Sequence, residues 1–203
     1  MPRRRRPTCV GAAPRGQLPY IVDGDQTVGD SDTIIAHLFV HHDLPADAAL
    51  IADATLTQAQ RDTNHLISRL LDDLYWVMSY ARWKDERFWP AFRDGLLQQH
   101  PSLTPEGLLK AREFNFQRYH YQGIGRFAPD AADARGLVDL QVQANLIPAS
   151  GYLHGARPCS ADAAIYGFIA NILFYPIETP LKQFVDGQDN LVRHYRAIHE
   201  ALQ

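Results

Sequence analysis

The sequence predicts a mostly α-helical protein in which a small α/β unit, a β-hairpin plus one helix, is followed by an all-α bundle. Three observations support this fold class. The turn dipeptide Asp23–Gly24 lies between two short runs of strand-forming residues. Apolar residues recur with helical spacing through most of the chain after residue 57. Residues 160–173 are almost wholly apolar, as expected of a helix at the centre of a bundle.

The first residues are basic and the rest of the chain is acidic. Residues 1–22 contain five arginines and no acidic side chain, whereas the remainder has 15 basic and 23 acidic side chains. This acidic body is poorly suited to nucleic acid, and no apolar run approaches the length of a membrane span. Residues 1–15 contain three prolines and lack the apolar core of a signal peptide. We therefore expect a disordered basic leader there, with an arm that binds RNA or anionic lipid as the alternative. The two cysteines provide no disulfide framework, which favours a reducing cytoplasm.

Residues 16–42 form the predicted α/β unit. A strand at 18–22 leads into the turn, and residues 26–28 form the return strand. Asp30 or Ser31 then caps a helix that runs to about residue 41. The inner face of this helix is predicted to carry Ile34, Ile35 and Leu38.

Residues 43–56 are irregular and are predicted to link this unit to a helical domain at 57–203. Thr57 and Gln60 form a capping box for a helix that runs to about residue 83. The predicted apolar stripe of this helix consists of Leu66, Leu70, Leu74, Val77 and Met78. Further helices are predicted at about 86–98, 105–121, 129–146, 160–173, 180–185 and 190–202.

Three segments together resemble the glutathione transferase superfamily over about residues 16–203. LPYIVDGDQTVGDSDTII, at 18–35, resembles the second half of its thioredoxin-like domain, with a cis-proline, a hairpin, and an acid–Ser pair at a helix start. GARPCSADAAIYGFIANIL, at 155–173, resembles the family's central helix with its capping motif and buried aspartate. YQGIGRF, at 121–127, is similar to the failed axon connections and metaxin-like branch.

The resemblance implies a glutathione site at Leu18, Pro19, Asp30 and Ser31. The backbone of Leu18, beside Pro19, would pair with the cysteinyl part of glutathione as an added strand would. Ser31, at a helix N-terminus, would receive the γ-glutamyl carboxylate, and Asp30 would accept from the ligand's ammonium group. The alternative is that Ser31 is only part of a helix cap and that Leu18–Pro19 only begins a strand.

The family's thiolate-stabilising residue has no counterpart that the spacing allows. Only residues 10–18 separate Cys9 from Pro19, and a parallel crossover needs about a dozen residues or more. We therefore expect the first strand, the first helix and the second strand of the thioredoxin-like domain to be missing, as in a truncated gene reading, and expect little transferase activity. The catalytic residue is unknown, and the alternative function is a non-catalytic, metaxin-like interaction module.

The resemblance also implies a pocket in the helical domain for a small hydrophobic electrophile. Its candidate lining is aromatic or cationic, with core packing as the alternative: Trp76, Tyr80, Trp83, Tyr119, Tyr121 and Arg126. Asp162 is expected to brace the central helix together with Ser160, since Cys159 stands where the family usually has Thr or Ser.

Glutathione is the only ligand or cofactor that the sequence predicts, and the resemblance allows a homodimer. A metal site is not expected at His41, His42 and Asp43, because adjacent histidines on a helix point apart.

Overall fold

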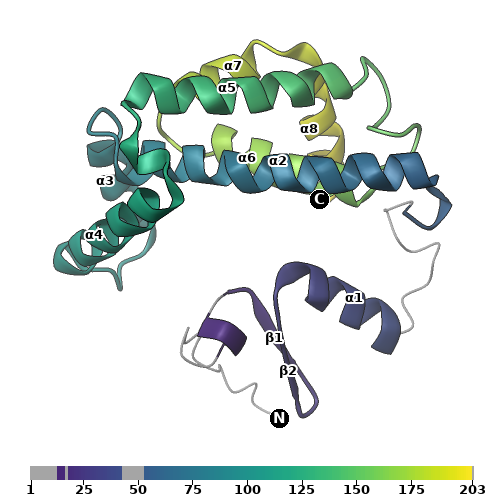
Figure 1. Cartoon of the computed structure of the whole chain (residues 1–203), viewed down its shortest axis with the longest axis horizontal. Helices are drawn as coiled ribbons and strands as arrows, with labels where there is room; N and C mark the ends of the chain where they lie inside the picture. Colours follow the sequence, from purple (N-terminus) through teal and green to yellow (C-terminus); the bar gives the residue numbers. More distant parts are fainter. Residues whose placement is uncertain (1–12, 17, 43–52, 203) are drawn as a thin grey trace. The chain divides into compact units, whose positions relative to one another are not determined.

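The computed structural model describes residues 13–16, 18–42 and 53–202, and the chain divides into two compact units, residues 1–49 and 50–203. Figure 1 shows both, with the hairpin in the first unit and the helical bundle in the second. Most of the expected basic leader, and residues 43–52 of the expected linker, lie outside the described residues. The predicted fold class, a hairpin and helix followed by a helical domain, is confirmed.

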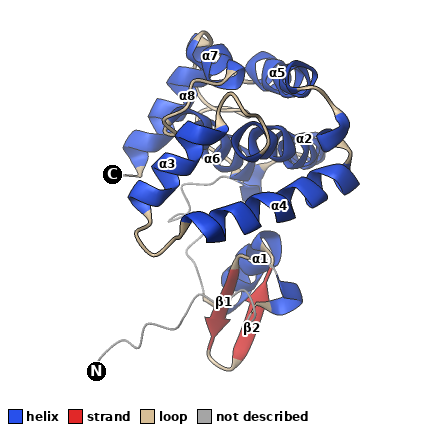
Figure 2. Cartoon of the chain, turned by 90° about the vertical axis from the view of Figure 1, so that its left-hand side faces the viewer, coloured by secondary structure: helices blue, strands red, loops and turns tan. Residues whose placement is uncertain are grey.

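The first unit consists of a short 3-10 helix η2 (Pro14–Gly16), strands β1 (Tyr20–Asp23) and β2 (Gln26–Gly29), and helix α1 (Ser31–His41). The strands are antiparallel, with Tyr20 opposite Gly29 and Asp23 opposite Gln26. Figure 2 shows the two strands side by side. The two-residue loop is therefore at residues 24–25, one residue later than the predicted turn dipeptide. Gly24 has φ of 57°, a conformation that glycine adopts without a steric penalty.

Two expectations for this unit were wrong. Ala13 is buried and Pro14 begins a 3-10 helix, so the expected disorder up to residue 15 does not hold at these two residues. A Cβ atom on Gly29 would lie 3.1 Å from Cβ of Pro14, so this helix packs closely on β2. Ile34 is buried as predicted, but Ile35 is 52% exposed, because it follows Ile34 by one residue and points about 100° away from it.

The regular elements of the second unit are helices in its described residues, apart from an isolated β-bridge between Tyr152 and Gly155. The unit contains two short 3-10 helices, η3 (Asp53–Thr55) before α2 and η4 (Ile124–Arg126) after α4. The helices are α2 (Gln58–Trp83), α3 (Trp89–Gln99), α4 (Pro105–Gln122), α5 (Pro129–Leu146), α6 (Ser160–Leu173), α7 (Pro180–Asp186) and α8 (Asp189–Ala201). None of the helices in the described residues is long and apolar enough to cross a membrane.

Helices α2 and α6 form the centre of the core. Figure 1 shows α2 running beside α5 and α6, and α2 is in contact with both. The side chains of Leu74, Ile165 and Ile169 have no exposed surface, which confirms that the apolar segment 160–173 is a buried helix. The capping box at Thr57 and Gln60 is also confirmed. Leu66 is 68% exposed, so the predicted stripe is wrong there, and the buried positions at this end of α2 are Ile67 and Leu71.

The predicted second helix of the bundle begins three residues too early. Residues 86–88 form turns, and α3 begins at Trp89. The N–H of Arg87 donates to Oδ1 of Asp85 at 2.9 Å, and this local hydrogen bond favours a turn over a continuous helix.

A glycine permits a close contact between three helices of the core. A Cβ atom on Gly136 of α5 would lie 2.8 Å from Cγ1 of Val77 in α2 and 2.9 Å from Cδ2 of Leu181 in α7. These distances are too short for real carbon atoms, so any side chain at this position would push the three helices apart.

Candidate functional site

The residues predicted to hold glutathione lie at one end of the hairpin. The Leu18–Pro19 peptide bond is cis, as predicted. The N–H of Asp30 donates to the carbonyl oxygen of Pro19 at 3.2 Å, so the start of β1 adjoins the start of α1. Leu18 is 57% exposed, and Pro19, Asp30 and Ser31 are exposed as well. The fold therefore places the four predicted residues together at one accessible edge of the first unit.

Asp30 has an unusual backbone conformation. Its φ is 77° and its ψ is 130°, outside the regions that non-glycine residues normally occupy. Its side chain caps α1, because Oδ1 accepts hydrogen bonds from the N–H and the hydroxyl of Thr33, each at 3.1 Å. Ser31 is the first helical residue and not the cap. Strained residues of this kind concentrate at binding sites.

The accessible edge at these four residues suits a ligand that carries both a carboxylate and an ammonium group. The first amide groups of α1 have no acceptor within the helix and carry a positive partial charge, so they favour a carboxylate. Asp30 and Asp32 lie in the same turn and provide negative charge that favours an ammonium group.

Two of the six candidate pocket residues lie inside the helical core. Tyr80 is 2% exposed, and its hydroxyl group donates to the carbonyl oxygen of Phe127 at 3.0 Å. Tyr119 has no exposed surface, and its hydroxyl group lies 2.7 Å from Oγ of Ser79. Burial raises the pKa of both phenols, so both stay protonated at neutral pH.

The other four candidates are more accessible and do not form one group. Trp76 and Trp83 are partly buried, and their rings pack against different neighbours, Trp76 at Tyr119 and Trp83 at Trp89. Tyr121 is 83% exposed at the end of α4. It lines a shallow depression on that helix with Glu113, Phe116, Gln117 and His120. Arg126 is exposed on η4.

Asp162 braces the central helix as the sequence predicted. It has no exposed surface, and its Oδ2 accepts the N–H of Cys159 at 2.8 Å. Its Oδ1 accepts the N–H of Leu153 at 2.9 Å and lies 2.7 Å from Nε2 of His194. Burial alone would raise the pKa of this carboxyl group, but these three hydrogen bonds outweigh burial and the pKa is lowered.

Ser160 and Cys159 share the start of this helix. Cys159 is the N-cap, and the N–H of Ser160 donates to Oδ1 of Asp53 at 2.9 Å. Ser160 therefore stabilises the helix start through its backbone, and it is not the cap. Cys159 is fully buried, and burial raises the pKa of its thiol to about 11, which makes it a poor nucleophile.

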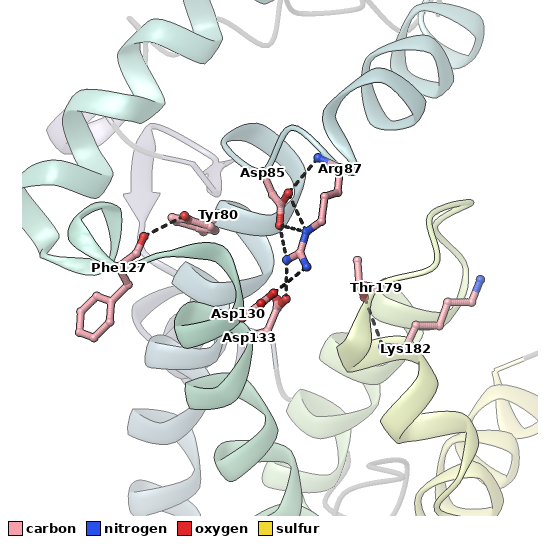
Figure 3. A network of polar contacts seen from close by, with 8 residues as sticks. All are labelled: Tyr80, Asp85, Arg87, Phe127, Asp130, Asp133, Thr179 and Lys182. Carbon is pink, nitrogen blue, oxygen red and sulfur yellow. Dashed lines mark hydrogen bonds and ion pairs between the residues drawn. The ribbon is translucent and has the colours of Figure 1, made fainter.

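A charged network that sequence reasoning missed joins the turn before α3 to the start of α5 (Figure 3). Nη2 of Arg87 lies 2.7 Å from Oδ2 of Asp85 and 2.9 Å from Oδ2 of Asp133, and Nη1 lies 2.7 Å from Oδ1 of Asp130. Asp85 and Asp133 are buried, so the guanidinium group neutralises two carboxylates that water cannot solvate. The Asp85-x-Arg87 spacing was visible in the sequence, but its pairing with α5 was not.

Comparisons with known proteins agree with the order of the two units along the chain. The family model of the glutathione S-transferase N-terminal domain matches residues 3–88, and that of the C-terminal domain matches residues 137–198. The isoprene-epoxide–glutathione S-transferase of Rhodococcus sp. (strain AD45) is 29% identical over 194 residues, which cover 93% of this chain and 79% of that protein. Failed axon connections of Drosophila melanogaster is 23% identical over 194 residues, covering 89% of this chain and 45% of that protein. No solved structure gives a significant match.

The two matched domains stand in the order that the fold shows, with the hairpin unit first and the helical unit second. The chain belongs to the glutathione transferase superfamily.

Proposed function

We propose that this chain binds glutathione through its first unit and acts as a glutathione transferase-like protein on a small hydrophobic electrophile. One observation carries the proposal: both glutathione S-transferase domain models match the chain, in the order of the two units. The chemistry would be conjugation, or glutathione-dependent reduction, by attack of the glutathione thiolate.

The edge formed by Leu18, Pro19, Asp30 and Ser31 supports this proposal through its chemistry. The hydroxyl group of Ser31 and the first amides of α1 suit the γ-glutamyl carboxylate, and Asp30 suits the adjacent ammonium group. The exposed backbone at Leu18 suits strand-like pairing with the cysteinyl residue. These four residues would hold the peptide part of glutathione and leave its sulfur unassisted.

The electrophile would contact the helical unit. Trp76, Trp83, Tyr121 and Arg126 remain candidates for this contact because each is at least partly accessible. Tyr80 and Tyr119 would act indirectly, by supporting these residues from the core. The relative from Rhodococcus is named for an epoxide substrate. We therefore propose that a small epoxide is the first electrophile to test.

We propose that turnover is slow. The segment between Cys9 and Pro19 is too short for a strand, a helix and a second strand, so Cys9 is a poor candidate for the thiolate-stabilising position. A glutathione thiol that no such group assists keeps a pKa near 8.5 or above, and only a small fraction is ionised at pH 7.

Retention of the purified full chain on immobilised glutathione, with elution by free glutathione, tests the binding step. Ser31→Ala should weaken binding about 10-fold or more, because a hydrogen bond to a charged group contributes about 1.5–3 kcal/mol. Ser102→Ala, at an exposed loop serine of the other unit, is the matched control and should bind as the unchanged chain does. Failure of the unchanged chain to be retained would overturn the proposal.

A conjugation assay with glutathione and an epoxide tests the chemical step. We expect a rate only slightly above the uncatalysed reaction. Fast turnover would contradict the proposed deficit while leaving glutathione binding intact.

A second candidate function is a non-catalytic interaction module, which the similarity to Failed axon connections favours. It predicts a stable complex with another protein in the absence of glutathione binding. We propose a cytoplasmic location, because two cysteines provide no disulfide framework, and a homodimer, which the family resemblance allows. Light scattering on the purified chain measures the oligomeric state.

A further inference from the structure

Three potential metal ligands meet where the tip of the hairpin adjoins the end of α1. Oδ2 of Asp23 lies 2.7 Å from Nε2 of His37 and 2.8 Å from Nε2 of His42. Their ligand atoms all lie within 4.8 Å of one another. Asp23 ends β1, His37 is on α1, and His42 follows the last residue of α1. The three residues therefore close the unit at the end opposite to Asp30 and Ser31.

From these contacts we propose that Asp23, His37 and His42 form a binding site for a divalent transition-metal ion such as Zn²⁺, which fastens α1 to the hairpin.

The ligand set fits this class of ion. Two imidazole nitrogens and one carboxylate oxygen are a donor combination that Zn²⁺ accepts, with a fourth position left for water. Ligand atoms around a tetrahedral zinc ion lie about 3.3 Å apart. The two contacts of Asp23 would each open by about 0.5 Å, and the Nε2 atoms of His37 and His42, which lie within 4.8 Å of each other, would come to the same spacing. The neutral imidazole rings would carry their proton on Nδ1 and present Nε2 to the metal.

The surroundings favour a cation. The C-terminal end of α1 carries a negative partial charge, and His42 lies directly at this end. The side chain of His37 is only 10% exposed, whereas that of His42 is 45% exposed. A buried inner ligand and an accessible outer ligand leave a route for the ion to enter.

The first unit would benefit from such a link. Among its described residues, only Ala13 and Ile34 are buried hydrophobic residues, and the sheet has two strands. A hairpin of this size is marginal in water, and small units with little core commonly use a metal to hold them together. Sequence reasoning missed this site because Asp23 and His37 are 14 residues apart and meet only after the hairpin and α1 have packed.

Titration of the chelator-treated full chain with Zn²⁺, followed by calorimetry, tests the proposal. One saturable ion per chain is expected. His37→Gln and Asp23→Asn should each weaken binding more than about 100-fold, since even the loss of a partner outside the ligand set costs 10–100-fold. His65→Gln, at an exposed histidine of α2, is the matched control and should leave this binding unchanged.

Hydrogen exchange provides a readout that does not depend on affinity alone. Zn²⁺ should slow exchange of the amides of β1 and α1 in the unchanged chain and in His65→Gln, but not in His37→Gln. Binding that survives in both Asp23→Asn and His37→Gln would place the ion elsewhere and overturn the proposal, as would the absence of saturable binding. Neither measurement uses glutathione, so its outcome is independent of the proposed transferase function.

Discussion

Replacing Asp162 by alanine should destabilise the helical unit strongly. This carboxylate is fully buried and accepts from the N–H of Cys159, the N–H of Leu153 and Nε2 of His194. It thereby links the start of α6 to the preceding loop and to α8. Alanine would remove the acceptor and leave two buried donors, on Cys159 and His194, and the partly buried N–H of Leu153 without this partner.

The expected loss follows from these contacts. An unsatisfied buried donor costs about 1–3 kcal/mol, and more where the lost hydrogen bond was to a charged group such as this carboxylate. These effects overlap because one side chain makes all the contacts, so we expect a total loss of about 4 kcal/mol. Domains of this size have unfolding free energies of about 5–15 kcal/mol, so the variant would lose a large part of its stability.

Urea unfolding followed by tryptophan fluorescence is the assay. All three tryptophans, Trp76, Trp83 and Trp89, lie in the helical unit, so their signal reports on it. With a urea m-value of about 2 kcal/mol/M, the midpoint should fall by about 2 M. Asp189→Ala is the matched control, because Asp189 is an exposed acid at the start of α8 and its loss should cost below about 1 kcal/mol.

The sign of the pH effect gives a second check. The pKa of Asp162 is lowered in the folded state, so its contribution is present above the unfolded value of about 3.9 and is lost as pH falls through the folded value. The difference between the unchanged chain and Asp162→Ala should shrink in acid. A loss no larger than that of Asp189→Ala at pH 7 would refute the reasoning.

Three further predictions concern other features of the helical unit. Gly136→Ala should lower stability by about 1–3 kcal/mol because its Cβ would overlap two neighbouring helices, whereas Gly167→Ala, with no atom within 4 Å, should raise it by up to about 1 kcal/mol; equal unfolding midpoints would contradict this. Arg87→Met should cost about 3 kcal/mol by leaving two buried carboxylates unpaired, against less than about 1 kcal/mol for Arg135→Met at an accessible ion pair, measured by thermal unfolding. Burial raises the pKa of Asp139 to about 6, so its ionisation lowers stability as pH rises from about 4 to 6; Asp139→Asn should therefore be more stable than the unchanged chain at pH 8, with the difference vanishing near pH 4.

Local sequence signals predicted most of the helical unit. The helices at 129–146 and 160–173 have the predicted bounds, because proline, capping residues and apolar spacing act within one or two helical turns. These signals failed where two adjacent residues were equally suited to face the core. Leu66 and Ile67 are adjacent apolar residues, and only the packing of α2 decided that Ile67 would be buried.

The candidate site residues also divide into those that the sequence predicted and those whose role depended on packing. Leu18, Pro19, Asp30 and Ser31 were predicted from the family resemblance, and they lie together because they flank a short hairpin, whose turn fixes which strand ends meet. The role of the aromatic candidates in α2 and α4 was harder to predict, because a tyrosine in a helix can line a pocket or fill a core equally well. Tyr80 and Tyr119 fill the core, since their hydroxyl groups find partners there.

The sequence by itself determined the elements, their order and the family, since these depend on short-range patterns and on similarity along the chain. Tertiary structure alone decided which ionisable groups meet: Arg87 with Asp133, Asp162 with His194, and Asp23 with His37 and His42. The physical reason is that burial leaves an ionised group without water, so its stability depends on a partner that folding brings from a distant part of the chain.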